Sequence, residues 1–142
     1  MWWERIRRRW EEDGFDVWAA VLKQTDGLVG WIGLAVSDWL PELMSSTEVG
    51  WLLDRRYWGR GLATEGGAAS LTYAFGTLDV ERVVSICHSA NTASERVMQR
   101  LGMRREGDSI HPKFGTPLLI YALGREEWIR DRGVNNVGEN YS

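Results

Sequence analysis

A short stretch rich in arginine and glycine, residues 56–63, constrains the fold of this chain more than any other part of its sequence. It reads Arg56-Tyr57-Trp58-Gly59-Arg60-Gly61-Leu62-Ala63. An apolar pattern typical of a strand precedes it, and one typical of a helix follows it. Gly59 and Gly61 can adopt backbone angles closed to residues with a Cβ, so consecutive N–H groups can turn toward one anion. The stretch therefore predicts a strand, a phosphate-binding turn and a helix start, and with them a phosphate-bearing cofactor.

The residues around these glycines exclude two other phosphate-binding loops. A Walker loop needs Gly-Lys followed by Ser or Thr, but no lysine follows Gly61. A dinucleotide-binding loop needs a third glycine where this chain has Thr64. It also needs an acid at the end of the next strand, whereas Glu81 stands at the beginning of that strand.

Length and charge limit the class of protein. The 142 residues suffice for one domain with a real core but not for two. We predict a single domain over residues 1–130 and a polar, mobile tail over residues 131–142. The net charge of -3 gives no general attraction to nucleic acid or anionic membranes. No apolar segment has the length of a membrane span. We therefore expect neither a nucleic-acid partner nor a membrane partner.

The cysteine content and the first residues indicate a compartment. Cys87 is the single cysteine and ends an apolar run, so we expect a buried thiol in a reducing environment. The first three residues, Met1-Trp2-Trp3, lead into charged residues rather than a signal-peptide core. We therefore expect a cytoplasmic protein.

Periodicity predicts an α/β order of elements. Apolar residues at helical spacing predict an opening helix that ends near residues 13–14. Three more helices are expected: one that begins near Ala63, one over residues 92–101 and one over residues 125–130. The expected strands are 17–23, 28–36, 47–53, 82–87, 103–106 and 117–123, with a hairpin turn at 24–27 and loops at 37–46 and 107–116.

The helix that begins near Ala63 contains two adjacent glycines, Gly66 and Gly67. Each should cost about 1 kcal/mol relative to alanine in a helix interior. Close approach of the helix to the sheet or to the cofactor is one explanation, and drift in a tolerant helix is another. The predicted buried face of this helix consists of Gly67, Leu71, Ala74, Phe75 and Leu78.

A second informative cluster, residues 88–94, runs from an expected strand into the next helix. Thr92 and Glu95 have the spacing of a capping box, so Thr92 can cap the helix and leave Asn91 free to bind a ligand. The alternative is that Asn91 itself caps the helix. His88 is also a candidate here, because histidine is the residue type most often used for proton transfer. The predicted inner face of the helix carries Ala93, Val97 and Leu101.

From about Trp10 to Trp128, these motifs in this order resemble the GNAT superfamily of acyltransferases. Its coenzyme A loop has the order Arg-x-x-Gly-x-Gly-x-Ala, and its second coenzyme A motif resembles Asn-x-x-Ser followed by Leu-Gly-Met. Within the superfamily, the chain is most similar to the branch of ribosomal-protein N-terminal acetyltransferases. The similarity lies in Glu48-Val49-Gly50-Trp51-Leu52-Leu53, Gly61-Leu62-Ala63-Thr64-Glu65, Asn91-Thr92-Ala93-Ser94, Leu101-Gly102-Met103 and Tyr121-Ala122-Leu123.

The resemblance implies an α/β fold whose mixed, mostly antiparallel sheet is flanked by helices. Residues 47–53 and 82–87 would be parallel neighbours that splay apart, with the cofactor arm in the gap against the backbone of Leu52 and Leu53. It also implies an enzyme, an N-acetyltransferase that uses acetyl-CoA as co-substrate and no metal. The positions implied for cofactor binding are Leu52, Leu53, Arg56, Trp58, Gly59, Arg60, Gly61, Ala63, Thr64, Asn91 and Ser94.

Acetyl transfer needs a neutral amine, a stabilised oxyanion and a proton for a thiolate whose reference pKa is about 8.5. The resemblance implies that Glu48 takes the amine proton through a water. The alternative is that Glu48 is an exposed acid at the end of a strand with no role in catalysis. Many members place a tyrosine seven residues after the helix asparagine, where this chain has Met98. Ser94, with Tyr121 as second choice, is then the candidate proton donor. His111 is expected in a surface loop.

Two questions stay open at this stage. The acceptor is either a protein N-terminal amine or a small-molecule amine, and the acids of the two long loops favour a cationic one. The branch normally begins with a strand and a helix before the segment matched by residues 6–10, and this chain starts too late to contain them. There are three explanations. The true start of the gene lies further upstream, a second subunit of a homodimer supplies this side of the cleft, or the protein has lost efficient activity. A non-catalytic acyl-CoA-binding or interaction domain is therefore the alternative function.

Overall fold

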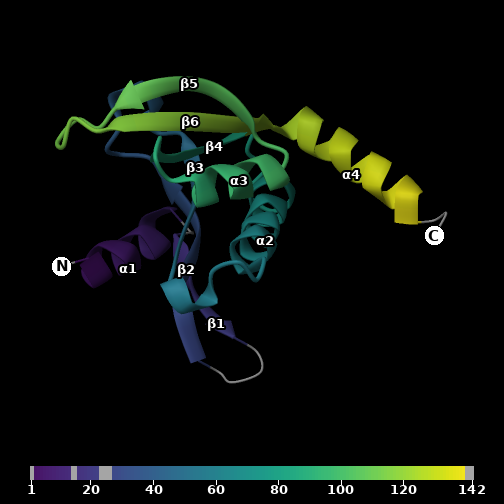
Figure 1. Cartoon of the computed structure of the whole chain (residues 1–142), viewed down its shortest axis with the longest axis horizontal. Helices are drawn as coiled ribbons and strands as arrows, with labels where there is room; N and C mark the ends of the chain where they lie inside the picture. Colours follow the sequence, from purple (N-terminus) through teal and green to yellow (C-terminus); the bar gives the residue numbers. More distant parts are fainter. Residues whose placement is uncertain (1, 14–15, 23–26, 140–142) are drawn as a thin grey trace.

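The computed structural model describes residues 2–13, 16–22 and 27–139 (Figure 1). Its helices are α1 (Trp2–Asp13), α2 (Leu62–Gly76), α3 (Thr92–Arg100) and α4 (Arg125–Glu139), with short 3-10 turns η1 (Pro41–Leu43) and η2 (Arg55–Tyr57). Its strands are β1 (Val17–Leu22), β2 (Gly27–Val36), β3 (Thr47–Leu53), β4 (Arg82–His88), β5 (Arg104–Ile110) and β6 (Pro117–Gly124). The hairpin turn predicted before β2 lies mostly outside the described residues.

The described strands form one six-stranded sheet in the order β1-β2-β3-β4-β6-β5. Its neighbours are antiparallel except β3 and β4, which are parallel. These two strands pair only at Thr47 with Val83 and at Glu48 with Val84, and then diverge. The hydroxyl of Ser85 donates a hydrogen bond to the carbonyl of Val49 (2.8 Å) where the strands part. The mixed sheet with a splayed parallel pair is therefore confirmed.

Each face of the sheet carries a core, because alternate residues of a strand point to opposite sides. In Figure 1, α2 and α3 lie against one face. There Leu34, Val49 and Val83 pack in one cluster with Phe75 of α2 and Met98 of α3. Cys87 belongs to this cluster and is buried, as predicted. On the other face a second cluster is built from Leu40, which precedes η1, from Leu43 of η1 and from three residues of the sheet, namely Val84, Leu118 and Ile120.

The two glycines inside α2 allow the helix to approach its neighbours closely. A Cβ on Gly66 would lie 2.4 Å from Cδ1 of Ile32 in β2, and one on Gly67 would lie 2.8 Å from Cδ1 of Leu101. Both distances are too short for real side chains, so close packing rather than drift explains the glycines. Of the predicted buried face, Gly67, Leu71, Ala74 and Phe75 are buried, whereas Leu78 is half-buried and lies beyond the end of α2.

The inner face of α3 differs from the prediction. Met98 is the buried residue of this helix, whereas Ala93 is exposed and Val97 is half-buried. Met98 packs beside α2 in the main core, while Ala93 and Val97 line a pocket described below. The helix is therefore rotated about its axis relative to the prediction.

The strand predicted at 103–106 is longer than expected, and the loop predicted at 107–116 is correspondingly shorter. A register shift between Arg105 and Gly107 lets β5 resume its pairing with β6 as far as Ile110. Such a bulge inserts one residue without ending the strand. A turn over residues 111–116 then connects the two strands, closed by a hydrogen bond from the N–H of His111 to the carbonyl of Thr116 (2.8 Å).

The last helix also exceeds its prediction, since α4 continues past residue 130 to Glu139. In Figure 1 it extends away from the sheet beyond the end of β6. The mobility expected for residues 131–142 stays a prediction. Within residues 2–13, 16–22 and 27–139, no helix combines the length and the apolarity needed to cross a membrane.

Candidate cofactor and catalytic site

The predicted phosphate-binding turn connects β3 to α2. Gly59 and Gly61 both have φ of +76°, and Gly61 is the N-cap of α2. A Cβ at either position would meet no atom within 4 Å. The turn therefore requires glycine for its backbone angle and not for space. No side chain caps the start of α2 at Gly61, so the N–H groups of its first turn are available to a ligand.

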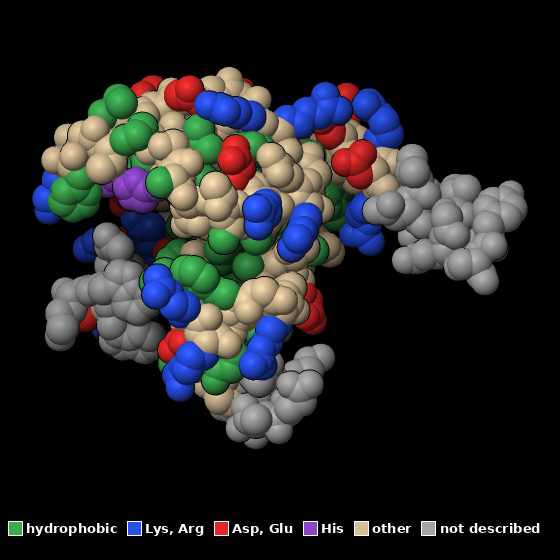
Figure 2. All heavy atoms as spheres, viewed as in Figure 1, with side chains coloured by type: hydrophobic (Ala, Val, Ile, Leu, Met, Phe, Trp, Pro, Cys, Tyr) green, Lys and Arg blue, Asp and Glu red, His purple; other side chains and the backbone are tan. Residues whose placement is uncertain are grey.

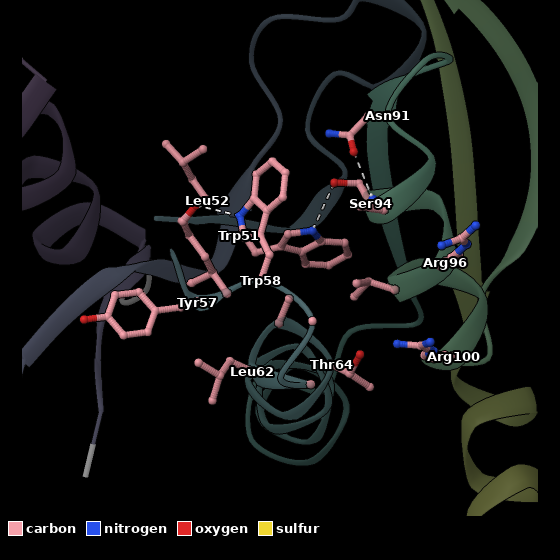
Figure 3. Close-up of a pocket in the computed structure, with 16 residues that line it drawn as sticks. Trp51, Leu52, Tyr57, Trp58, Leu62, Thr64, Asn91, Ser94, Arg96 and Arg100 are labelled. Carbon is pink, nitrogen blue, oxygen red and sulfur yellow. Dashed lines mark hydrogen bonds between the residues drawn. The ribbon is translucent and has the colours of Figure 1, made fainter. Parts of the chain in front are cut away.

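A pocket of about 250 Å³ opens between this turn, the end of β3 and one face of α3 (Figure 3). In the space-filling view, apolar side chains occupy a hollow near the centre of the molecule, with Lys and Arg side chains around it (Figure 2). Nine of the predicted cofactor residues line the pocket, namely Leu52, Leu53, Trp58, Gly59, Gly61, Ala63, Thr64, Asn91 and Ser94. The structure thus brings together two motifs that are about thirty residues apart in the sequence.

Two predicted cofactor residues, Arg56 and Arg60, do not line this pocket. The guanidinium of Arg56 binds both carboxylate oxygens of Asp54, with Nε–Oδ1 and Nη2–Oδ2 distances of 3.0 Å each. This side-chain hydrogen bonding lowers the pKa of Asp54 to about 2. The guanidinium of Arg60 lies over the ring of Tyr57, 5.4 Å from its centroid. Both arginines therefore contact the turn itself.

Seven lining residues were not predicted, namely Trp51, Tyr57, Leu62, Ala93, Arg96, Val97 and Arg100. Arg96 and Arg100 are one helical turn apart on α3, and Arg100 lies across the pocket from Thr64 (Figure 3). Neither takes part in an ion pair within the described parts of the chain. The four-residue spacing of two arginines after the asparagine motif is a signal that sequence analysis could have used.

A buried hydroxyl at the start of α2 indicates which kind of ligand would fit the pocket. Oγ1 of Thr64 is buried and has no hydrogen-bond partner within the described residues. Buried polar atoms are normally satisfied, so an unsatisfied one that lines a pocket fits a ligand with polar atoms. The helix start, the two left-handed glycines and this hydroxyl together fit a diphosphate, whose oxygens accept hydrogen bonds.

At the start of α3, Asn91 and not Thr92 is the cap. Oδ1 of Asn91 accepts a hydrogen bond from the N–H of Ser94 (3.1 Å), so the prediction that Thr92 caps and leaves Asn91 free is wrong. The capping bond uses the side-chain oxygen of Asn91, while its amide N–H groups can still donate to a ligand. Asparagine and threonine both serve as N-caps, and the backbone conformation decides between them.

The hydroxyl of Ser94 is oriented by a tryptophan on β3. Nε1 of Trp51 donates a hydrogen bond to Oγ of Ser94 (3.3 Å), and both side chains line the pocket (Figure 3). Because the indole can only donate, it occupies an acceptor lone pair of the hydroxyl. The hydroxyl hydrogen of Ser94 is left to donate elsewhere.

Glu48 lies where β3 and β4 begin to diverge, outside the pocket. Strand alternation puts it on the face of the sheet opposite to Val49 and Trp51. Nε1 of Trp39 donates a hydrogen bond to Oε2 of Glu48 (3.2 Å). Burial raises the pKa of Glu48 to about 7, against the lowering effect of the Trp39 hydrogen bond. A carboxyl with this pKa exchanges protons near neutral pH.

Tyr121, the second candidate proton donor, is not brought to the pocket. It is buried in β6, where its hydroxyl donates to Oε2 of Glu95 (2.7 Å) and accepts from Nε2 of Gln99 (3.3 Å). Burial and the hydrogen bond to Glu95 raise the pKa of Tyr121. This tyrosine therefore attaches α3 to the sheet.

The two histidines lie close together, outside the pocket. His88 is exposed at the end of β4, and its ring is parallel to that of His111 with 6.5 Å between the centroids. His111 lies in the surface turn after β5, as predicted, and its side chain is half-buried there. Its ring also contacts Trp39, the partner of Glu48, at a centroid distance of 5.2 Å.

Known proteins are similar to this chain in sequence and in fold. The family described as "Acetyltransferase (GNAT) domain" matches residues 1–104. The chain is 36% identical over 85 residues to "Uncharacterized N-acetyltransferase YnaD" of Bacillus subtilis, covering 57% of this chain and 50% of that protein. It is 32% identical over 91 residues to "FsC-acetyl coenzyme A-N(2)-transacetylase" of Aspergillus fumigatus, covering 59% of this chain and 38% of that protein.

Among solved structures, an acetyltransferase of the GNAT family from Bacillus anthracis superposes with a TM-score of 0.67 at 32% identity. The superposition covers 80% of this chain and 68% of that one. The chain spans about half the length of the curated relatives it matches.

Proposed function

The chain belongs to the GNAT acetyltransferase family, and on this premise we propose that it transfers the acetyl group of acetyl-CoA directly to a primary amine. One observation carries the proposal. A pocket begins at the left-handed turn of Gly59 and Gly61, contains the hydroxyl of Thr64 that has no partner among the described residues, and extends along the end of β3, beyond the point where this strand diverges from β4. Such a pocket offers phosphate contacts at one end and a gap between strands at the other.

The phosphate end would be held by backbone and by positive charge. The N–H groups at the start of α2 and the hydroxyl of Thr64 would donate to the diphosphate, favoured by the positive end of the helix dipole. Arg96 and Arg100 would contact the cofactor's phosphate oxygens from α3. Cofactor binding by Arg56 and Arg60, which do not line the pocket, stays a prediction.

The arm that carries the thioester would lie along the end of β3. Leu52 and Leu53 line the pocket here, and the indole N–H of Trp58 already donates to the carbonyl of Leu53 (2.9 Å). A carbonyl oxygen has a second lone pair, so Leu53 can still accept from an amide of the arm. The side-chain amide of Asn91 would donate from the opposite wall.

The acceptor amine would approach from the other face of the sheet, where Glu48 lies. Glu48 would take the proton from the ammonium through a water, and the freed nitrogen lone pair would attack the thioester carbonyl. A backbone N–H of Leu52 or Leu53 would stabilise the oxyanion. The carbon–sulfur bond then breaks, the hydroxyl of Ser94 would protonate the thiolate, and the second proton lost by the attacking nitrogen would return to the oxygen of Ser94. The hydrogen bond from Trp51 supports this role because it leaves the hydroxyl hydrogen free to donate.

The pKa of Glu48 favours an acceptor of the N-terminal type. A base with a pKa of about 7 is mismatched by about one unit with an α-amine, whose pKa is about 8, and by more than three units with an alkylamine. We therefore propose an α-amine or another amine of lowered pKa as the preferred acceptor. Membership of the ribosomal-protein branch, a homodimer and a cytoplasmic location stay predictions.

Release of free thiol from acetyl-CoA tests the proposal. The assay uses a panel of peptides with free N-termini, polyamines and aminoglycosides, and mass spectrometry identifies the acetylated product. We expect amine-dependent thiol release that Glu48→Gln reduces strongly at neutral pH. Acetyl-CoA binding without release on any amine would contradict acetyl transfer and leave the non-catalytic acyl-CoA-binding function.

A further inference from the structure

The carboxylate of Glu48 is held at one of its two oxygens. The indole N–H of Trp39, nine residues earlier in the chain, donates to Oε2 at 3.2 Å. A tryptophan can only donate at this nitrogen, and a carboxylate is the stronger acceptor when ionised. The bond therefore favours the charged form of Glu48 and fixes the plane of its carboxylate.

The indole is itself held by the turn between β5 and β6. The ring of His111 lies 5.2 Å from that of Trp39, and Phe114 lies 4.7 Å from His111. Nδ1 of His111 accepts hydrogen bonds from the backbone N–H groups of Lys113 (3.1 Å) and Phe114 (3.2 Å), which fixes the histidine ring. A continuous set of rings thus connects this turn to Glu48.

The charged and titratable groups near Glu48 come from four parts of the chain. Arg9 of α1 is hydrogen-bonded to Asp38, which directly precedes Trp39. Asp38 raises the pKa of Glu48 and Arg9 lowers it, both less than burial does. His111 contacts Trp39, and His88 at the end of β4 contacts His111. Trp39 is the residue that contacts the carboxylate by a hydrogen bond within the described residues.

We propose that Trp39 is a positioning residue for Glu48: its indole holds Oε2 and so directs Oε1 toward the proton of the acceptor amine. The inference rests on the proposed function for the identity of that proton. In the step, the proton leaves the ammonium nitrogen and joins Oε1 through a water, and the nitrogen keeps the electron pair. Trp39 exchanges no proton, so it acts only through Glu48.

The test replaces the indole of Trp39 by benzothiophene, using incorporation of 3-benzothienylalanine, because this ring has nearly the same shape and lacks the N–H. The same replacement at Trp128, which packs on Phe75 at a centroid distance of 5.1 Å, is the matched control. Carbon-13 NMR of labelled glutamate carboxyls follows the titration of Glu48, and Glu48→Gln identifies its resonance. This readout does not depend on enzyme activity.

When benzothiophene replaces the indole of Trp39, the titration midpoint of Glu48 should rise by about one pH unit, as expected for the loss of one hydrogen bond to a carboxylate. The acidic limb of the pH profile of kcat/KM should shift by the same amount. The protein with the same replacement at Trp128 should show neither shift. An unchanged midpoint of Glu48, or an equal shift at Trp128, overturns the inference. If the unmodified protein released no thiol with any amine, the proposed function would be overturned instead. The NMR titration would still show whether the indole of Trp39 holds the carboxylate of Glu48.

Discussion

Alanine at Gly61 tests whether the left-handed turn before α2 binds the cofactor. Gly61 has φ of +76°, and a Cβ there would meet no atom within 4 Å, so the cost of Gly61→Ala is conformational. That cost is about 1–2 kcal/mol for a residue with a Cβ. If the turn keeps its shape, the cost appears as a lower free energy of unfolding. If the turn relaxes, the cost appears as weaker binding of acetyl-CoA, by up to about 5- to 30-fold in Kd.

A second glycine provides the matched control. Gly115 has φ of +67° and equally open surroundings, but it lies in the turn between β5 and β6 and does not line the pocket. Gly115→Ala should therefore lose a similar free energy of unfolding and bind acetyl-CoA as the wild type does. Urea denaturation gives the free energy of unfolding, and titration calorimetry with acetyl-CoA gives Kd for all three proteins.

In Gly61→Ala, the loss in free energy of unfolding and the loss in free energy of acetyl-CoA binding should add up to about 1–2 kcal/mol. Part of this sum should appear in binding. Wild-type values for both stability and affinity in this variant would refute the conformational argument. An equal loss of affinity in Gly115→Ala would refute the assignment of the turn before α2 to the cofactor.

Changes at other positions test the base, the packing of α2 and the phosphate contact. The kcat/KM should rise with pH through about 7, where Glu48 ionises, and Glu48→Gln should lose this limb. Because the folded pKa lies above the usual 4.5, Glu48 stabilises the fold fully below pH 4.5 and loses this effect as pH rises through 7. In denaturation experiments Glu48→Gln should therefore gain stability relative to the wild type at pH 8 but not at pH 4. Gly66→Ala, with a Cβ 2.4 Å from Ile32, should lower the free energy of unfolding by about 1–3 kcal/mol. Gly76→Ala, in open space, should raise it by up to about 1 kcal/mol by the same measurement. In steady-state kinetics Arg96→Gln should raise KM for acetyl-CoA about fivefold and reduce its dependence on salt.

The glycine turn before α2 could be predicted because its signal is local. Two glycines between a strand pattern and a helix pattern specify left-handed angles whatever surrounds them, and both angles are present. The same holds for the order of strands and helices, which follows from periodicity. The splayed pair of β3 and β4 came from the family resemblance instead, because spacing along the chain does not show where two strands part.

The side-chain partners could not be predicted in this way. Arg56 and Arg96 are equally basic in the sequence, but Asp54 binds the first and leaves it outside the pocket. Trp51 reaches Ser94 across forty-three residues, a contact that exists only after the strands and α3 have assembled. Strand β5 was predicted too short because a bulge, which interrupts the alternating pattern, resembles a strand end in the sequence.

The backbone amide resonances of Gly59, Gly61 and Thr64 during titration with acetyl-CoA test the central claim most directly. We expect large shifts at these three residues that saturate with the cofactor, while the amide of Gly115 stays in place. Saturated binding that leaves the Gly59 and Gly61 amides unshifted, or no binding at all, would contradict the account.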